Sequence, residues 1–160
     1  MTREAFVEQR RASAMEIFRR GYNCCQAVLM AFEDITGLDS STLVKIGSGL
    51  GGGVARMREV CGTVSGMAIV CGFICPSDDP QDQSKRKACY ELVQRLAGEF
   101  RELNGSVVCR ELLGLESSGW QKPEPSVRSA RFYKKRPCEQ LVGDSAAIIA
   151  GYLYDRKEAR

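Results

Sequence analysis

Residues 59–75 read EVCGTVSGMAIVCGFIC, an apolar stretch that carries three of the eight cysteines of the chain. The spacing of its apolar residues predicts a helix from about Val54 towards Phe73. The longest apolar window, residues 62–76, is too short and too rich in glycine and small polar residues to span a bilayer. We therefore expect a helix buried in a protein core, and no membrane insertion.

Helical spacing of apolar residues continues before this stretch. A helix over residues 1–20 is expected to end at Gly21. A second helix is expected to start after the N-cap residue Asn23 and to stop at Gly37. Both predicted helices therefore have stop or start residues of the expected type.

The C-terminal half is also expected to be helical. Further helices are predicted after the cap residue Asp39, over residues 81–103, in the short stretch CRELLG and from near Pro137 onwards. Residues 116–137, rich in serine, proline and basic residues, are the expected surface loop. No segment alternates with the period of a strand, so the predicted fold class is all-α, with residues 1–160 forming a single-domain bundle of about five or six helices.

Charge and export signals restrict where the protein works. The chain has 23 basic and 20 acidic residues, a balance that predicts no general attraction to nucleic acid or to anionic membranes. The N-terminus MTREAFVEQRRASAMEIFRRG lacks the continuous apolar region of an export signal, so we expect a cytoplasmic protein. In the reducing cytosol, eight cysteines indicate free thiols, a metal site or a redox couple.

The chain contains no histidine. This absence excludes Ser-His and Cys-His nucleophilic pairs, histidine metal ligands and the usual general base near neutral pH. Any chemistry of the cysteines must therefore use other neighbours.

Two further motifs have weak functional interpretations. The run GSGLGG, residues 47–52, matches G-x-G-x-x-G, but no strand precedes it and no acidic ribose partner follows in a βαβ context. Its glycines are better explained as a close backbone approach to the start of the helix that carries Cys61. The basic run RSARFYKKRP, residues 128–137, is interpreted as a solvated loop and not as a nucleic-acid site.

Three cysteines are predicted to lie at helix starts. Cys24 follows Asn23, Cys138 follows Pro137, and Cys109 opens CRELLG. Free amides and the positive end of the helix dipole stabilise a thiolate at such a position, so we expect lowered thiol pKa values there.

Basic residues stand near these thiols in the sequence. Arg110 and Arg136 are expected to favour the thiolates of their neighbours, and Arg56 and Arg58 precede Cys61 in the same way.

The remaining cysteines have simpler explanations. Cys71, Cys75 and Cys89 lie among apolar residues, where cysteine commonly fills the core. Cys25 follows Cys24 directly, and on a helix its side chain points about 100° away, so the two cannot easily share one site.

The motifs GYNCCQAVLMAF, GSGLGGGVARMREVCGTVSG, VCRELLG and PCEQLV together resemble the redox-active family named for its C_GCAxxG_C_C cysteine pattern. The resemblance runs from about Gly21 to the last helix. It implies that the family positions are Cys24, Cys61, Cys109 and Cys138. Thr63 departs from the pattern, which has alanine after the Cys-Gly pair.

Three functional hypotheses follow. The preferred one is a thiol-based oxidoreductase in which these four cysteines converge and exchange electrons with a partner protein or a small thiol. The second places a metal on the same four cysteines, either a tetrahedral Zn site or an iron–sulfur cluster. The third is a helical interaction module in which the cysteines only pack.

Overall fold

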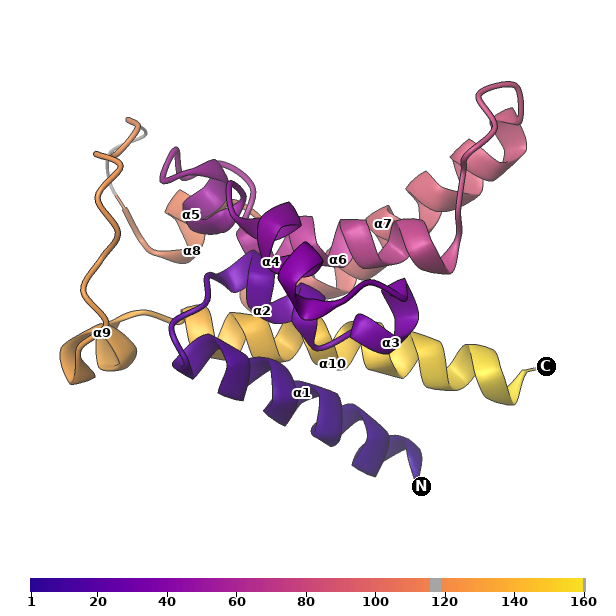
Figure 1. Ribbon diagram of the computed structural model, residues 1–160, viewed down its shortest axis with the longest axis horizontal. Helices are drawn as coiled ribbons and strands as arrows, with labels where there is room; N and C mark the ends of the chain where they lie inside the picture. Colours follow the sequence, from indigo (N-terminus) through magenta and orange to yellow (C-terminus); the bar gives the residue numbers. More distant parts are fainter. Residues whose placement is uncertain (116–118, 160) are drawn as a thin grey trace.

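A computed structural model describes residues 1–115 and 119–159 (Figure 1). Within these ranges the chain forms ten helical segments and no strand, apart from an isolated bridge between Val60 and Val108. The segments are α1 (Arg3–Arg19), α2 (Cys24–Met30), α3 (Glu33–Thr36), α4 (Ser40–Gly47), α5 (Gly51–Val54), α6 (Gly62–Ile74), α7 (Gln83–Asn104), α8 (Cys109–Leu112), α9 (Ala130–Lys135) and α10 (Cys138–Glu158). The helical fold class agrees with the prediction, but five or six helices is not the right count, because several segments are single turns.

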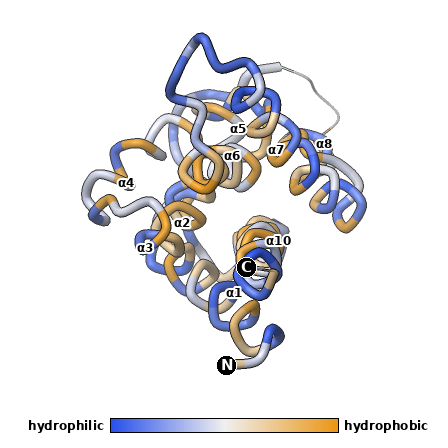
Figure 2. The backbone as a smooth tube through the Cα atoms, turned by 90° about the vertical axis from the view of Figure 1, so that its right-hand side faces the viewer, coloured by the Kyte–Doolittle hydropathy of each residue, from blue (hydrophilic) through white to orange (hydrophobic). Residues whose placement is uncertain are grey.

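The helix α10 contacts four other helices of the bundle, namely α1, α2, α6 and α7. Figure 2 shows it end-on, with these helices below it, to its left and above it. It runs antiparallel to α1, which lies along its length (Figure 1). Small buried residues such as Ala146, Ala150 and Gly151 let these neighbours approach closely.

Two polar contacts fix the position of α10 in this packing. The guanidinium of Arg11 on α1 pairs with the buried carboxylate of Asp144 at 2.7 Å. The hydroxyl of Ser145 donates a hydrogen bond to the backbone carbonyl of Thr63 on α6, at 2.9 Å. Because both partners of each pair come from different helices, these bonds set the register of α10 against α1 and α6.

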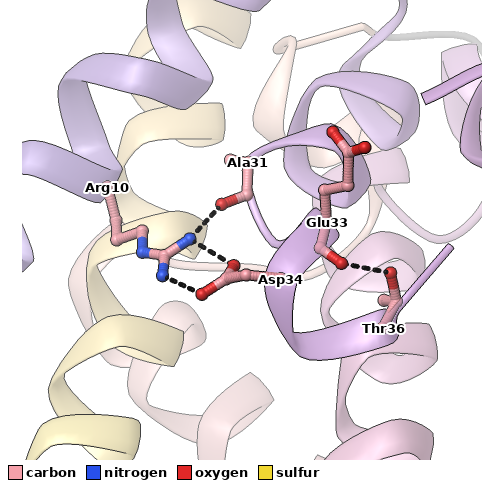
Figure 3. Close-up of polar contacts among 5 residues, drawn as sticks. All are labelled: Arg10, Ala31, Glu33, Asp34 and Thr36. Atoms are coloured by element: carbon pink, nitrogen blue, oxygen red, sulfur yellow. Dashed lines mark hydrogen bonds and ion pairs between the residues drawn. The ribbon is translucent and has the colours of Figure 1, made fainter. Parts of the chain in front are cut away.

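The second predicted helix is divided into α2 and α3. The break falls at Phe32, whose backbone is not helical (φ −124°, ψ 33°). Arg10 of α1 stabilises this break. Its guanidinium donates a hydrogen bond to the Ala31 carbonyl at 2.7 Å and pairs with the carboxylate of Asp34 (Figure 3). The expected end of α3 at Gly37 is confirmed, with a left-handed φ of 69°.

The helix predicted from about Val54 starts later than expected. The helix α6 begins at Gly62, and the preceding segment is left-handed at Gly52, Gly53 and four other residues. The non-glycine residues with positive φ are Val54 (65°), Ala55 (48°), Arg56 (67°) and Arg58 (59°). Backbone hydrogen bonds from residues 57–59 back to residues 52–54 close this segment into a tight loop, which apolar periodicity alone does not predict.

The stretch predicted as a surface loop, residues 116–137, contains the short helix α9. Residues 116–118 of that prediction lie outside the described residues. That residues 1–160 form a single domain stays a prediction. In the described part of the chain, no helix combines the length and the hydrophobicity needed to cross a membrane.

Candidate functional site

Four cysteines from four different helices line one cavity of about 540 Å³. Cys24, Cys109 and Cys138 are the first residues of α2, α8 and α10, and Cys61 is the N-cap residue of α6. The helix starts predicted for the first three are therefore confirmed. We call these four residues the pocket thiols.

Two glycines allow the helices to approach at this cavity. A Cβ atom at Gly62 would overlap Cys24 Sγ, and one at Gly53 would lie 2.6 Å from Cys109 Cβ. Gly53 also has a φ of +65°, a backbone conformation that residues other than glycine rarely adopt. Close backbone approach near Cys61, expected from the sequence, is thus present.

A buried arginine contacts the sulfur of Cys109. Arg58 is 5% exposed, and its Nη1 lies 3.5 Å from Cys109 Sγ. Its Nε donates to the Gln121 side-chain oxygen at 2.8 Å, and no carboxylate of the described residues pairs with it. A thiolate at Cys109 would therefore be the counter-ion of a buried cation.

The left-handed segment places Arg58 there. The Arg58 backbone N–H donates to the Gly52 carbonyl, which folds the chain back over the start of α5. The neighbouring Arg56 donates from Nε to the Lys122 carbonyl and from Nη1 to the Ser126 hydroxyl. The two arginines thus hold residues 121–126 beside the cavity.

Arg110 has an acidic partner in the structure. Although Arg110 follows Cys109 directly, its side chain pairs with Glu59 at 2.9 Å, at the surface. Arg136, by contrast, lowers the pKa of the Cys138 thiol as expected, although this effect is smaller than that of burial.

The lowered thiol pKa values expected at helix starts are not found for Cys24 and Cys138. Burial raises the pKa of the Cys24 thiol, and burial together with a charge on Cys24 raises the pKa of Cys138 to about 11. The same two causes raise the pKa of Cys61 to about 12. Loss of hydration destabilises the thiolate form of these residues more than the positive end of a helix stabilises it.

Thr63 is a member of the site that the sequence did not indicate. Its side chain is fully buried, and its hydroxyl lies 3.1 Å from Cys61 Sγ. This hydrogen bond favours the thiolate of Cys61, although burial outweighs it. The sequence showed Thr63 only as a departure from the family pattern.

Side chains from the predicted surface loop also belong to the cavity. Arg128 and Phe132 line it, and Arg128 stacks over the Phe18 ring at 4.1 Å and donates to the Phe18 carbonyl. The interpretation of this basic run as a solvated loop is therefore wrong for Arg128. The mixture of aromatic and basic residues in this run was the sequence signal that could have indicated its place at the cavity.

The other cysteines do not line the cavity. Cys71 is fully buried in the core, as predicted, while Cys75 and Cys89 are partly buried. We call these three the distal thiols. Burial raises the pKa of Cys71 to about 12, and charges on Cys89 and Cys75 contribute to this rise. Cys25 is fully buried, and burial raises its pKa to about 12.

All eight cysteines are free thiols in the structure. Among residues 1–115 and 119–159, no three side chains of the His, Cys, Asp or Glu type form a group that could hold a metal ion. The pocket thiols therefore share a cavity without forming a set of metal ligands, and the predicted zinc or iron–sulfur site is not confirmed.

Comparison with known proteins places this arrangement in a family. No curated protein and no solved structure matches the chain. Residues 22–152 match the family described as "Putative redox-active protein (C_GCAxxG_C_C)". The matched region contains all four pocket thiols and spans most of the sequence. The chain belongs to the C_GCAxxG_C_C family.

Proposed function

We propose that the protein is a thiol–disulfide oxidoreductase that uses the pocket thiols. The observation that carries this proposal is the buried guanidinium of Arg58 beside Cys109 Sγ, in a cavity that three other thiols share. Free thiols also agree with the reducing cytosol, where we propose that the protein works. Its partner would be a redox protein or a small thiol compound.

Cys109 is the attacking residue in this proposal. Arg58 supplies the positive charge that a thiolate needs in a buried place, and it has no described carboxylate to neutralise it. Cys24, Cys61 and Cys138 have raised pKa values and remain protonated near neutral pH.

Cys24 is the proposed resolving residue. A charge on Cys24 or on Cys109 raises the pKa of both Cys61 and Cys138, and a charge on Cys109 also raises the pKa of Cys24, so Cys24 and Cys109 lie near each other and near the other two thiols. Its Sγ packs against Gly62 at the start of α6, where a side chain would exclude it.

The reaction balances with these two residues. The Cys109 thiolate attacks one sulfur of a disulfide, the S–S bond breaks, and the first half leaves as a thiolate that takes the proton of Cys24. The Cys24 thiolate then attacks Cys109 sulfur and releases the second half as a thiolate, whose charge Arg58 neutralises. The two cysteines lose two electrons, and the substrate disulfide gains them.

The test uses the reduced protein and hydroxyethyl disulfide, an uncharged probe, without oxygen. The intact protein should release both halves of the probe and form a Cys24–Cys109 disulfide, detected by peptide mass spectrometry. Cys24→Ser should stop at a mixed disulfide on Cys109, and Cys71→Ser should react like the unchanged protein. Release of the probe by Cys109→Ser at the original rate would overturn the assignment.

The same preparation separates this proposal from the two other hypotheses. Metal analysis and a visible spectrum of protein purified without oxygen should show no bound zinc or iron. A stoichiometric metal that is lost in Cys61→Ser would favour the metal site instead. If neither metal nor exchange is found and Cys61→Ser only lowers stability, the protein is a helical interaction module.

A further inference from the structure

Four arginines line the cavity of the pocket thiols, namely Arg56, Arg58, Arg128 and Arg136. Among its described lining residues there is no aspartate, glutamate or lysine. The cavity wall therefore carries several positive charges and no carboxylate of its own, and Glu124, which does not line it, offsets part of the charge on Arg56.

These arginines are also unpaired with carboxylates, as far as the structure describes the chain. Arg56 contacts carbonyl, hydroxyl and amide oxygens, and Arg128 donates to the carbonyls of Phe18 and Tyr22. Arg136 stacks on the ring of Phe132 at 5.7 Å. By contrast, several arginines elsewhere form ion pairs, and examples are Arg3 with Asp155, Arg11 with Asp144 and Arg110 with Glu59.

The cavity arginines are close enough to repel one another. Burial lowers the pKa of Arg56, and the charges of Arg58 and Arg136 lower it further, while Glu124 and Cys109 offset a smaller part. Like charges held together in a partly closed cavity raise the free energy of the empty site, and a bound anion offsets that cost. The site is therefore more favourable when it holds negative charge.

The lining also has apolar and sulfur atoms. Phe18, Leu112 and Leu141 line the same cavity as Cys109. Its volume of about 540 Å³ is within the range of small-molecule sites. An organic molecule with an apolar middle and negatively charged ends fits this lining better than a bare inorganic ion.

We propose that the pocket selects a small organic disulfide that carries carboxylates, with the arginines binding the carboxylates and the S–S bond presented to Cys109. This inference rests on the proposed function and names its substrate class. The exchange follows the balance given above: the substrate disulfide accepts two electrons and leaves as two carboxylate-bearing thiols, while Cys24 and Cys109 become a disulfide.

The kinetic test compares three disulfides of similar size and different charge. They are dithiodipropionate (negative), hydroxyethyl disulfide (neutral) and cystamine (positive), each mixed with the reduced protein. We expect dithiodipropionate to react at least about tenfold faster than cystamine at low salt, with the difference shrinking at high salt. Equal rates for the three would overturn the anion selectivity and leave the exchange reaction standing.

A pair of arginine variants tests the origin of the selectivity. Arg136→Gln should lower the rate with dithiodipropionate by about tenfold and lower the rate with the neutral disulfide far less. Arg131→Gln is the matched control, because Arg131 lies on α9, is exposed and does not line the cavity. An equal loss in both variants would overturn the role of the cavity arginines.

A binding test separates this inference from the exchange chemistry. Suberate resembles dithiodipropionate but has a carbon–carbon bond in place of S–S, so it can bind without reacting. Calorimetry should show that suberate binds to the unchanged protein and binds about tenfold more weakly to Arg136→Gln. Octanediol, which has no carboxylates, should not bind to the unchanged protein. Binding of suberate without any disulfide exchange would refute the proposed function and support the anion site, whereas no binding would refute the anion site.

Discussion

The helix α6 connects two groups of thiols that differ in their neighbours. Cys61 lies at its start among the pocket thiols, whereas Cys71, near its end, belongs to the distal thiols. Burial raises the pKa of both residues to about 12. The pocket group alone has a buried guanidinium on one of its sulfurs, Cys109. Reactivity is therefore expected to follow the charged neighbour and not the local density of cysteines.

The largest expected difference between the two groups is in disulfide exchange. Cys109→Ser removes the proposed attacking sulfur and should reduce the exchange rate by at least about a hundredfold. Cys71→Ser should leave the rate unchanged, since Cys71 lies outside the cavity. The measurement is release of thiol from hydroxyethyl disulfide, and a similar loss in the two variants would abolish the distinction between the groups.

The second prediction concerns the burial that both groups share. Unfolded cysteine has a pKa near 9.0, and Cys61 and Cys71 have folded values of about 12, so the folded protein holds more protons between these limits. Their stabilising contribution is complete below pH 9 and is lost as the pH rises towards 12, by about 1.4 kcal/mol per pH unit for each thiol.

Denaturant unfolding at several pH values measures this loss. Cys61→Ala and Cys71→Ala should each reduce the alkaline slope by a similar amount. A slope that depends on Cys61 alone would show that the two thiols differ in burial as well as in neighbours.

The third prediction tests the charged neighbour directly. Arg58→Gln keeps a hydrogen-bond donor but removes the positive charge beside Cys109, so the exchange rate near neutral pH should fall about tenfold. Arg110→Gln is the matched control, because Arg110 follows Cys109 in sequence but pairs with Glu59. An equal fall in the rate of the control would instead favour the neighbour in sequence.

The smallest expected effect is at Thr63, which distinguishes the start of α6 from its end. Thr63→Ala introduces the residue of the family pattern and removes the hydroxyl that contacts Cys61. We expect a loss of about 1 kcal/mol in the free energy of unfolding and a small further rise in the Cys61 pKa. Thr63→Ser, which keeps the hydroxyl, should preserve the pKa of Cys61.

Local signals in the sequence were sufficient for some parts of the site. Asn23 caps α2, and this cap acts within its own turn of chain. The starts of α8 and α10 were likewise readable, and with them the helix-start positions of Cys109 and Cys138.

The features that the sequence did not reveal depend on distant partners. The break after Ala31 needs Arg10 from another helix. The contact of Arg58 with Cys109 needs a loop of left-handed residues, a conformation that Val54 and Ala55 disfavour when isolated. Raised thiol pKa values depend on burial from all sides, which helix-start positions alone cannot predict.

The position of the pocket thiols at four separate helix starts has a consequence for folding. Cys24 and Cys138 are 114 positions apart in the chain. They line one cavity only after α10 has packed against α1, α2, α6 and α7. Contacts between such distant residues form late, since closing a long loop costs entropy before any contact repays it. Until then eight reduced cysteines are open to incorrect pairing, so the yield of refolding should depend on keeping the chain reduced until the bundle is complete.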